Sequence, residues 1–501
     1  MFPFVFGVLG FFGVLGVLHP MTSTSPLHRH PILAAAASGL ILALLLKFFW
    51  HALLGEPPLG YDLGFYRYLF IKHAEGWPPF QIAKMDSWAL DHPIGLFIFT
   101  SMLLKSGMPV DWLLGWIWNL MPVVLACVLA IVTDRRYGRV VGVLTLLMAL
   151  LSQAYFDGFA AMYWKTFVSL LCVVLAFDAF ERRPWLGMIF AVLAIAIHHQ
   201  TGLLFGLVFA SWIALQILWK RTSRATVATL LLIAILILFG GLLFYAQQWQ
   251  TVSRIFGEVM TLRGASGGNF PEVTAYLWTA PVLLALGLTG FVLSWQRERW
   301  TLWQLAVIWS AVFVFGRLIF YRRFFLQLDF FLLPFAALAL RDLWRMFPAT
   351  IIRTALVAAI LVQVGLSFHH MTTRGPSTDW ETIVTVERIE RIVPEEAIVI
   401  GLENASSVIL RGWLPQHRIG GPGLFAIDWK LELWEKFIGG THDDRVYLLS
   451  SVPRPVYLFA PPSFRRIYAD YADAFLSDPC FAKTAEPGVL EVVCDPLLPP
   501  Q

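Results

Sequence analysis

The residues in this sequence that could do chemistry are acids and histidines placed just beyond apolar stretches. Asp62 lies in GYDLGFYRYLF, directly after a strongly apolar run, and Asp157 lies in AYFDGFAAMYWK. Similar positions are taken by Asp91, His92, His198 and His199. A carboxylate or imidazole can act as a general base toward an acceptor hydroxyl. Such groups can also hold a divalent cation such as Mg²⁺ or Mn²⁺, with Asp62, Asp157 and His198 as the candidates.

Each of these residues also has a purely structural interpretation. Asp62 could cap a helix or close a turn in a solvated loop, and Asp91 with His92 could cap the short apolar helix that follows Pro93. The Asp157–Gly158 pair suits a turn between two helices. What favours a functional interpretation is that all of these segments are predicted below to lie at one membrane face.

A second group is basic. Arg317, Arg322 and Arg323 cluster in RLIFYRRFF, while Arg67 and Lys165 lie close in sequence to the two aspartates. Arginine at the level of the lipid headgroups can hold a phosphate oxygen through two hydrogen bonds. The alternative is that these side chains only extend toward ordinary headgroups. The segment 247–276 adds Arg254, Arg263 and a glycine-rich stretch, RGASGGNFPE, which suits a mobile lid.

The elements that must position these groups are predicted to be membrane helices. The chain has 501 residues, of which 58% are hydrophobic and only 14% charged, whereas about 25% charged is typical of soluble domains. The net charge of +4 and the lack of a Lys/Arg-rich tract argue against nucleic-acid binding. Runs suited to crossing a bilayer fall at about 32–54, 110–133, 138–156, 165–181, 184–199, 202–219, 225–246, 277–295, 301–317, 324–342 and 349–367.

Placing the basic clusters in the cytoplasm fixes the orientation of about eleven spans. The apolar segment 95–104 is too short to span and is predicted to be an interfacial or re-entrant helix. The long loop 55–109 and everything after residue 367 are then extracytoplasmic. Residues 1–31 form an N-terminal segment that is either an additional span or the result of start-site choice, and 32–367 form the membrane domain.

The remaining residues, 368–501, are predicted to form a small α/β domain. TDWETIVTVERIERIV and DWKLELWEKFIGG have helical periodicity, whereas AIVIGL and RVYLLSS are typical of short buried strands. Cys480 and Cys494 lie in this domain. In an oxidising compartment they could form a disulfide, but spacing alone leaves that open.

The order of these segments resembles the polytopic glycosyltransferases of the C-type fold, which include protein mannosyltransferases, aminoarabinose transferases and the catalytic subunit of oligosaccharyltransferase. The features that carry the resemblance are GYDLGFYRYLF in a long first external loop, HPIGLFIFTSMLLKSG, RRYGR-like inner turns, YFDGFAAMYWK, HHQTGLLF, RRFFLQLDFFLLPFAALAL and an external α/β tail. The resemblance covers most of residues 32–367, through short degenerate motifs. The paired acids of the oligosaccharyltransferase motif are missing at the second external segment.

The resemblance implies an all-α membrane enzyme that transfers a sugar from a polyprenyl-phosphate or diphosphate carrier outside the cytoplasm. It implies a catalytic role for Asp62, an acidic and in some members metal-binding role for Asp157, and a lipid-phosphate contact for Arg322 or Arg323. The acceptor would be a lipid, glycan or protein, and the setting the inner or plasma membrane of a prokaryote. The alternatives are a polymerase or ligase of lipid-linked glycans, a flippase or transporter, and a structural membrane component. A transporter is disfavoured because polar groups are scarce at the middles of the predicted spans.

Overall fold

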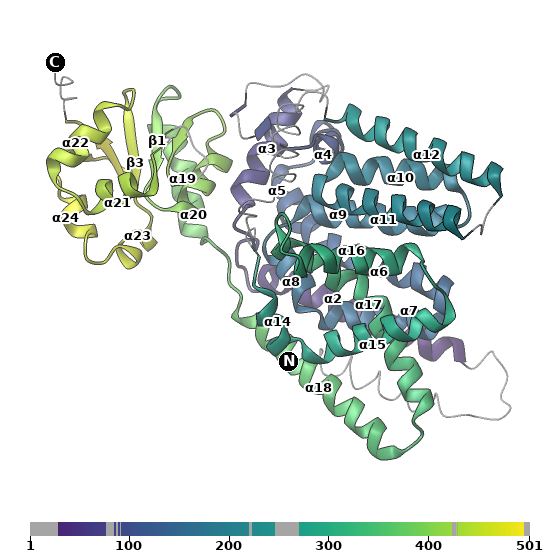
Figure 1. Ribbon diagram of the computed structural model, residues 1–501. Helices are drawn as coiled ribbons and strands as arrows, with labels where there is room; N and C mark the ends of the chain where they lie inside the picture. The colour runs from purple at the N-terminus through teal and green to yellow at the C-terminus, as the bar shows by residue number, and fades with distance from the viewer. Residues whose placement is uncertain are drawn as a thin grey trace. The chain divides into compact units, whose positions relative to one another are not determined.

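The structure is a computed structural model of the whole chain (Figure 1). It describes residues 29–76, 85–86, 89–90, 92–219, 223–245, 270–422, 427 and 429–494. The chain divides into two compact units. The membrane unit comprises Met1–Trp50, Pro93–Leu96 and Trp116–Gly375, and the α/β unit comprises His51–His92, Phe97–Gly115 and Pro376–Gln501. The predicted first external loop thus groups with the predicted C-terminal domain.

The membrane unit consists of helices. In chain order these are α2 (Arg29–Leu53, which ends in the α/β unit), α6 (Trp118–Tyr137), α7 (Arg139–Leu151), α8 (Gln153–Ala160), α9 (Trp164–Phe180), α10 (Pro184–Ile197), α11 (His199–Leu218), α12 (Arg224–Leu243), α14 (Val273–Thr279), α15 (Pro281–Arg297), α16 (Leu302–Phe315), α17 (Tyr321–Met346) and α18 (Thr350–Thr373). Every apolar run predicted above overlaps one of them. Helix α17 is the core of this unit, because 94% of its most apolar window is buried.

The predicted number of about eleven spans is not confirmed. Six helices in the described part of the chain are long and apolar enough to cross a membrane, and the number rises to eight if two bent pairs each count as one span. One bent pair is α7 with α8, at 57°, and the other is α14 with α15, at 100°. Helices α10 and α16 are apolar but shorter, as is α4 (Gly95–Lys105), which forms where a short non-spanning helix was predicted.

The α/β unit is built around a five-stranded sheet of order β2-β1-β3-β5-β4. Its strands are β1 (Ile398–Gly401), β2 (Arg418–Gly420), β3 (Val456–Phe459), β4 (Phe481–Lys483) and β5 (Val489–Val492). Strands β2, β1 and β3 are parallel, and β5 and β4 are antiparallel additions at one side. The surrounding helices are α19 (Trp380–Ile392), α20 (Asn404–Trp413), α21 (Leu431–Gly439), α22 (His442–Ser450), α23 (Pro462–Ile467) and α24 (Ala472–Leu476). The predicted small α/β fold is therefore correct.

One local prediction was wrong. The segment RVYLLSS, expected to be a strand, is part of helix α22. Thr441 and Asp444 form a capping box that starts this helix at His442, and such reciprocal capping satisfies the first free backbone N–H groups. Val446, Leu448 and Leu449 are buried all the same, which explains why the apolar residues of this segment resembled those of a buried strand.

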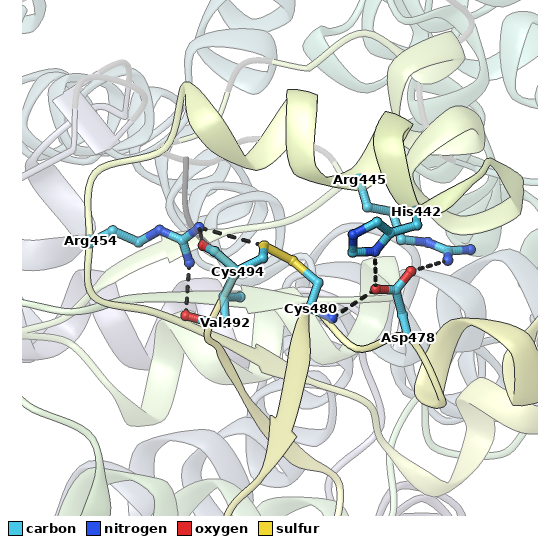
Figure 2. The surroundings of a disulfide bond; sticks show 7 residues. All are labelled: His442, Arg445, Arg454, Asp478, Cys480, Val492 and Cys494. Carbon is cyan, nitrogen blue, oxygen red and sulfur yellow. Dashed lines mark hydrogen bonds and ion pairs between the residues drawn. A yellow bond between two sulfur atoms is a disulfide. The ribbon is translucent and has the colours of Figure 1, made fainter. Parts of the chain in front are cut away.

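Cys480 and Cys494 form a disulfide (Figure 2), which the sequence left open. Beside it, the buried carboxylate of Asp478 pairs with Arg445 at 2.6 Å and with the Nδ1 atom of His442 at 2.7 Å. Burial works to raise the pKa of Asp478, but hydrogen bonds from the Cys480 amide, Arg445 and His442 outweigh it and lower the pKa. Together the disulfide and the charged group fix the chain between α24 and β4.

Candidate functional site

The first candidate site lies in the membrane unit and centres on Asp157 of helix α8. This helix starts where Ser152 caps it, with the Ser152 hydroxyl accepting a hydrogen bond from the Tyr155 amide. The bend between α7 and α8 leaves a short helix of eight residues, Gln153–Ala160, whose residues are almost all buried. Asp157 lies midway along it, with only 4% of its side chain exposed.

The carboxylate of Asp157 has partners on two other helices. The Tyr276 hydroxyl of α14 donates to Oδ2 at 2.5 Å, and the His370 Nε2 atom of α18 lies 2.8 Å from Oδ1. Arg374, just after α18, donates to Oδ1 from Nε at 3.1 Å and from Nη2 at 2.8 Å. These charge-assisted contacts hold α8, α14 and the end of α18 together. We refer to Asp157, Tyr276, His370 and Arg374 as the Asp157 cluster.

Two further buried ionisable side chains contact the junction between α7 and α8. The Lys47 ammonium of α2 donates to the carbonyl of Leu150 at 2.6 Å and of Ser152 at 3.2 Å. The Ser152 hydroxyl donates to the Asp329 carboxylate of α17 at 2.5 Å. Lys47 and Asp329 are 2% and 3% exposed. Sequence reasoning missed both, although an ionisable residue inside an apolar run is a functional-site signal by default.

The predicted basic residues gather in part around the histidine pair. Lys165 of α9 and Arg323 of α17 both interact electrostatically with His199 at the start of α11. The guanidinium of Arg323 lies over the rings of Tyr163 and Phe320, at 5.3 and 5.5 Å from the ring centres. Within the described residues, Arg323 forms no ion pair. We call Lys165, His199 and Arg323 the basic cluster.

The other residues predicted near this cluster have different surroundings. His198 is buried, and its Nδ1 atom lies 2.8 Å from the Thr201 hydroxyl, which in turn accepts from Gln327 at 3.0 Å. Arg322 forms an ion pair with Glu272. Arg317 is exposed, with a left-handed backbone (φ 48°) in the turn before α17. The structure thus brings Arg323, but not all three arginines, together with Lys165 and His199.

Asp62 lies in the α/β unit, at the start of helix α3 (Leu63–Glu75). It occupies the N-cap position, yet its side chain makes no capping hydrogen bond to the helix. The alternative that Asp62 serves to cap a helix is therefore not supported. Asp62 is half-buried. After burial, its charge is a cause of the raised pKa of the neighbouring Tyr61.

Helix α3 is held in place by helix α20 of the same unit. A side chain at Gly64 would put its Cβ 1.8 Å from the Val408 carbonyl oxygen, so only glycine permits this close helix crossing. Arg67 donates to the Gly412 carbonyl at 2.7 Å and to Asp111 at 3.2 Å, and lies over the Trp413 ring at 4.7 Å. Its contacts explain why a basic residue occurs among the aromatics of GYDLGFYRYLF: Arg67 anchors the helix that Asp62 begins.

Some predicted residues cannot be placed. Asp91, Arg254, Arg263 and the glycine-rich stretch 263–269 lie outside the described residues, as does the N-terminal segment up to residue 28. His92 is described and half-buried, close to the start of α4.

The described residues do not fit a divalent cation. They contain no group of three or more His, Cys, Asp or Glu side chains arranged to hold a metal ion. The oxygens of Asp157 are already engaged by Tyr276, His370 and Arg374. His198, the other metal candidate in this unit, has its Nδ1 atom on Thr201.

Comparison with solved structures identifies the fold. An oligosaccharyltransferase from Archaeoglobus fulgidus, solved with an inhibitory peptide and a dolichol phosphate, is 11% identical, with a TM-score of 0.58 over 84% of this chain and 69% of that one. An oligosaccharyltransferase from Archaeoglobus fulgidus solved with zinc and sulfate gives 12% identity and a TM-score of 0.56, over 84% of this chain and 68% of that one. ArnT from Cupriavidus metallidurans gives 13% identity and 0.55, over 94% and 98%. No family model and no curated protein matches the sequence.

The chain therefore has the fold of the C-type membrane glycosyltransferases, as the sequence resemblance predicted. The apolar helices and these neighbours make it an integral multi-pass membrane protein. At such low identity the likeness concerns the fold, and the chemistry has to be argued from the residues of this chain.

Proposed function

We propose that the protein is a glycosyltransferase that moves a sugar from a polyprenyl-phosphate or diphosphate carrier to an acceptor at the extracytoplasmic membrane face. The observation that carries the proposal is the fold, shared with ArnT over 98% of that chain, together with the basic cluster at the helix ends of the membrane unit. A neighbour solved with a dolichol phosphate agrees with a donor of this class.

The basic cluster suits the phosphate of such a donor. A prenyl chain stays in the bilayer, so its phosphate requires cationic groups near the ends of membrane helices. Arg323 offers a guanidinium that no carboxylate neutralises among the described residues, and Lys165 offers a second cation, since both lie close enough to His199 to interact with it electrostatically. Neutralising the departing phosphate lowers the barrier to breaking the sugar–phosphate bond. Arg317, Arg322, His92, Asp91 and His198 complete the substrate-binding residues that we propose.

Asp62 is proposed as the group that orients and deprotonates the acceptor. The acceptor oxygen attacks the anomeric carbon, its proton passes to the Asp62 carboxylate, and the bond to the phosphate oxygen breaks with its electron pair leaving on the phosphate. The configuration at the anomeric carbon inverts. Asp157 is the second acid that we assign to the reaction. Its contacts indicate that it acts by fixing α8 against α14 and α18.

A divalent cation remains the least supported part of the proposal. It is favoured by the neighbour solved with zinc and sulfate, and disfavoured by the donor groups described above. We therefore assign no step to it. Incubation with EDTA, followed by addition of Mg²⁺ or Mn²⁺, tests the point: transfer that is unaffected by EDTA excludes a required exchangeable ion.

The disulfide supports an extracytoplasmic location for the C-terminal domain, because disulfides persist mainly in oxidising compartments. Labelling of a cysteine introduced at exposed Tyr447, using a membrane-impermeant maleimide on intact cells, tests this location. Labelling that occurs only after the cells are opened would contradict it.

The decisive experiment uses the full-length protein in lipid nanodiscs, with a polyprenyl phosphate carrying radiolabelled mannose, glucose or aminoarabinose. A transferase releases free polyprenyl phosphate and moves the label onto an acceptor from a membrane extract. A polymerase or ligase yields a ladder of longer glycans instead. In sealed vesicles, a transporter or flippase moves the label across the membrane without any covalent change, and a structural component does neither.

A further inference from the structure

We propose that the α/β unit contains a second binding site, which takes a neutral saccharide. The site is a cavity of about 580 Å³, within the size range of small-molecule sites. The proposal concerns binding alone and does not require transfer to occur. Its use, as a subsite that holds an acceptor glycan, rests on the proposed function.

The cavity lies where α/β sheets bind ligands. Its lining includes Leu402, directly after β1, and Pro422, shortly after β2. Tyr468 contributes from the end of α23, the helix that follows β3. Strands β2, β1 and β3 are parallel, so these residues mark one edge of the sheet, the edge at the carboxyl ends of its strands. Ligands of open α/β sheets bind at that edge.

Aromatic rings dominate one part of the lining. Trp434 from α21 is buried, whereas Tyr471, just before α24, is 51% exposed at the rim. Helix α24 contacts both α21 and α23 (Figure 1), so the three segments that carry these aromatic residues pack against one another. A Cβ at Gly439 would lie 3.4 Å from the Tyr471 ring, so the glycine keeps a side chain of its own from packing against that part of the ring. Tyr and Trp combine a flat apolar face with a polar edge, which matches the apolar C–H face and hydroxyl edge of a pyranose.

The charges of the lining favour a neutral ligand over an anion. Lys436 is the basic residue of the lining, and it is paired with Asp444 at 2.9 Å. Hydrogen bonds from Thr441, followed by the one from Lys436, lower the pKa of Asp444 to about 2, so this pair stays ionised. Glu435 adds a negative charge to the lining. A phosphate or nucleotide would meet an acid and a cation that is already neutralised.

The polar groups can serve hydroxyls. Burial, and then the charge of Glu403, raise the pKa of Tyr468, so its phenol stays protonated and can both donate and accept a hydrogen bond. Glu435 can accept from a sugar hydroxyl. A purely apolar ligand such as an acyl chain would offer no partner to the half-buried Tyr468 hydroxyl, which costs free energy.

The test is saturation-transfer difference NMR on the full-length protein in nanodiscs, since glycoside detergents would compete. The probes are glucose, mannose, galactose, N-acetylglucosamine and their disaccharides at millimolar concentration. Tyr471→Ala removes one exposed stacking face and should weaken binding roughly three- to tenfold, the loss expected for one aromatic contact. The matched control is Tyr447→Ala, because Tyr447 is 60% exposed in the same unit but does not line the cavity.

A further variant, Arg323→Ala, separates this site from the proposed donor site. Saccharide binding that is unchanged in Arg323→Ala and weakened in Tyr471→Ala supports the inference, even if no transfer is ever observed. The inference is overturned if no saccharide binds, or if Tyr471→Ala and Tyr447→Ala bind alike. It is also overturned if inorganic phosphate or an acyl chain displaces the sugar more effectively than other sugars do.

Discussion

Arg445 of the α/β unit and Asp157 of the membrane unit are two buried charged groups whose partners come from different distances along the chain. In the α/β unit, Arg445 donates to Asp478 and to three backbone carbonyls, those of Phe437, Ile438 and Gly440. All of these partners lie within 33 residues of Arg445 in sequence. In the membrane unit, the carboxylate of Asp157 draws its partners from positions 119 to 217 residues away. The first arrangement is local and the second is long-range.

Local partners of this kind are expected of a stabilising group, but distant partners alone do not indicate function, because Arg67 of the α/β unit also contacts a carbonyl 345 residues away. Arg445 and Asp478 are both almost fully buried and satisfied by their own neighbourhood, as expected of a stabilising group. Lys47 in the membrane unit is also buried, but it finds only carbonyl and hydroxyl acceptors, and no carboxylate within 4 Å among the described residues. Charges that remain in an apolar environment at such cost mark functional regions by default.

The largest expected stability effect is that of Asp157→Ala. The change removes the acceptor of the hydrogen bonds from Tyr276 and Arg374 and the partner of His370. Because Arg374 is 43% exposed and can be solvated, the loss should be near the lower end of the about 3–5 kcal/mol that breaking a buried pair costs. The control is Glu298→Ala, whose ion pair with Arg136 is 47% exposed on the Glu298 side and should contribute less than about 1 kcal/mol. Thermal unfolding in nanodiscs measures both. Equal shifts would mean that the Asp157 cluster is not a special feature of the membrane unit.

Removal of the disulfide should have the next largest effect, confined to the α/β unit. Cys480 and Cys494 are 14 residues apart, and a loop of this length is stabilised by about 3 kcal/mol when closed. The double variant Cys480→Ser/Cys494→Ser should therefore unfold at a lower denaturant concentration. Cys127→Ser, at a cysteine that is not bonded, should not. A proteolysis rate of the C-terminal domain that is unchanged in the double variant would contradict the prediction.

Asp478→Asn should produce a smaller loss and change the dependence on pH. The change replaces charge-assisted hydrogen bonds to a carboxylate with hydrogen bonds to a neutral amide, and a hydrogen bond to a charged group contributes about 1.5–3 kcal/mol to stability. Because the pKa of Asp478 is lowered in the folded state, its contribution is present above the unfolded pKa of about 3.9 and is lost as the pH falls through the lowered folded pKa. The free energy of unfolding of the α/β unit should therefore fall less steeply with decreasing pH in the variant than in the unchanged protein. If the stability of both proteins falls with pH in the same way at acid pH, the ionisation of Asp478 does not contribute to stability.

The smallest effect is expected for Arg465→Ala. Arg465 pairs with Asp473, and both side chains are mostly exposed, at 64% and 82%. Surface pairs of this kind change stability by less than about 0.5–1 kcal/mol. A shift in the unfolding midpoint as large as that of Asp478→Asn would contradict the claim that exposed ion pairs stabilise this unit less than the buried Asp478 group does.

The sequence predicted the helices well because each apolar run is a local feature. The C-terminal α/β fold was likewise readable from alternating strand and helix patterns, with the exception of α22, where a capping box determined the outcome. The association of Asp157 with His370 and Arg374 could not be predicted. The residues are more than 200 positions apart, and no local pattern specifies such a pairing.

Other parts of the site left a signal that was overlooked. Lys47 and Asp329 are ionisable residues within apolar runs, and that alone could have singled them out. Arg67 was predicted to be a substrate ligand because of its charge and its position beside Asp62. Arg67 instead contacts Gly412 and Trp413. These residues lie about 345 positions away in the sequence, so no local pattern could indicate that contact.

The central claim is tested most directly by Asp62→Asn in the nanodisc transfer assay. The substitution removes the proposed base while keeping the size and hydrogen-bonding shape of the side chain, so transfer should fall by about 100-fold or more with an unchanged melting temperature. Asp473→Asn, at a side chain that is 82% exposed, is the control and should keep full activity. Transfer at the normal rate in Asp62→Asn would contradict the account.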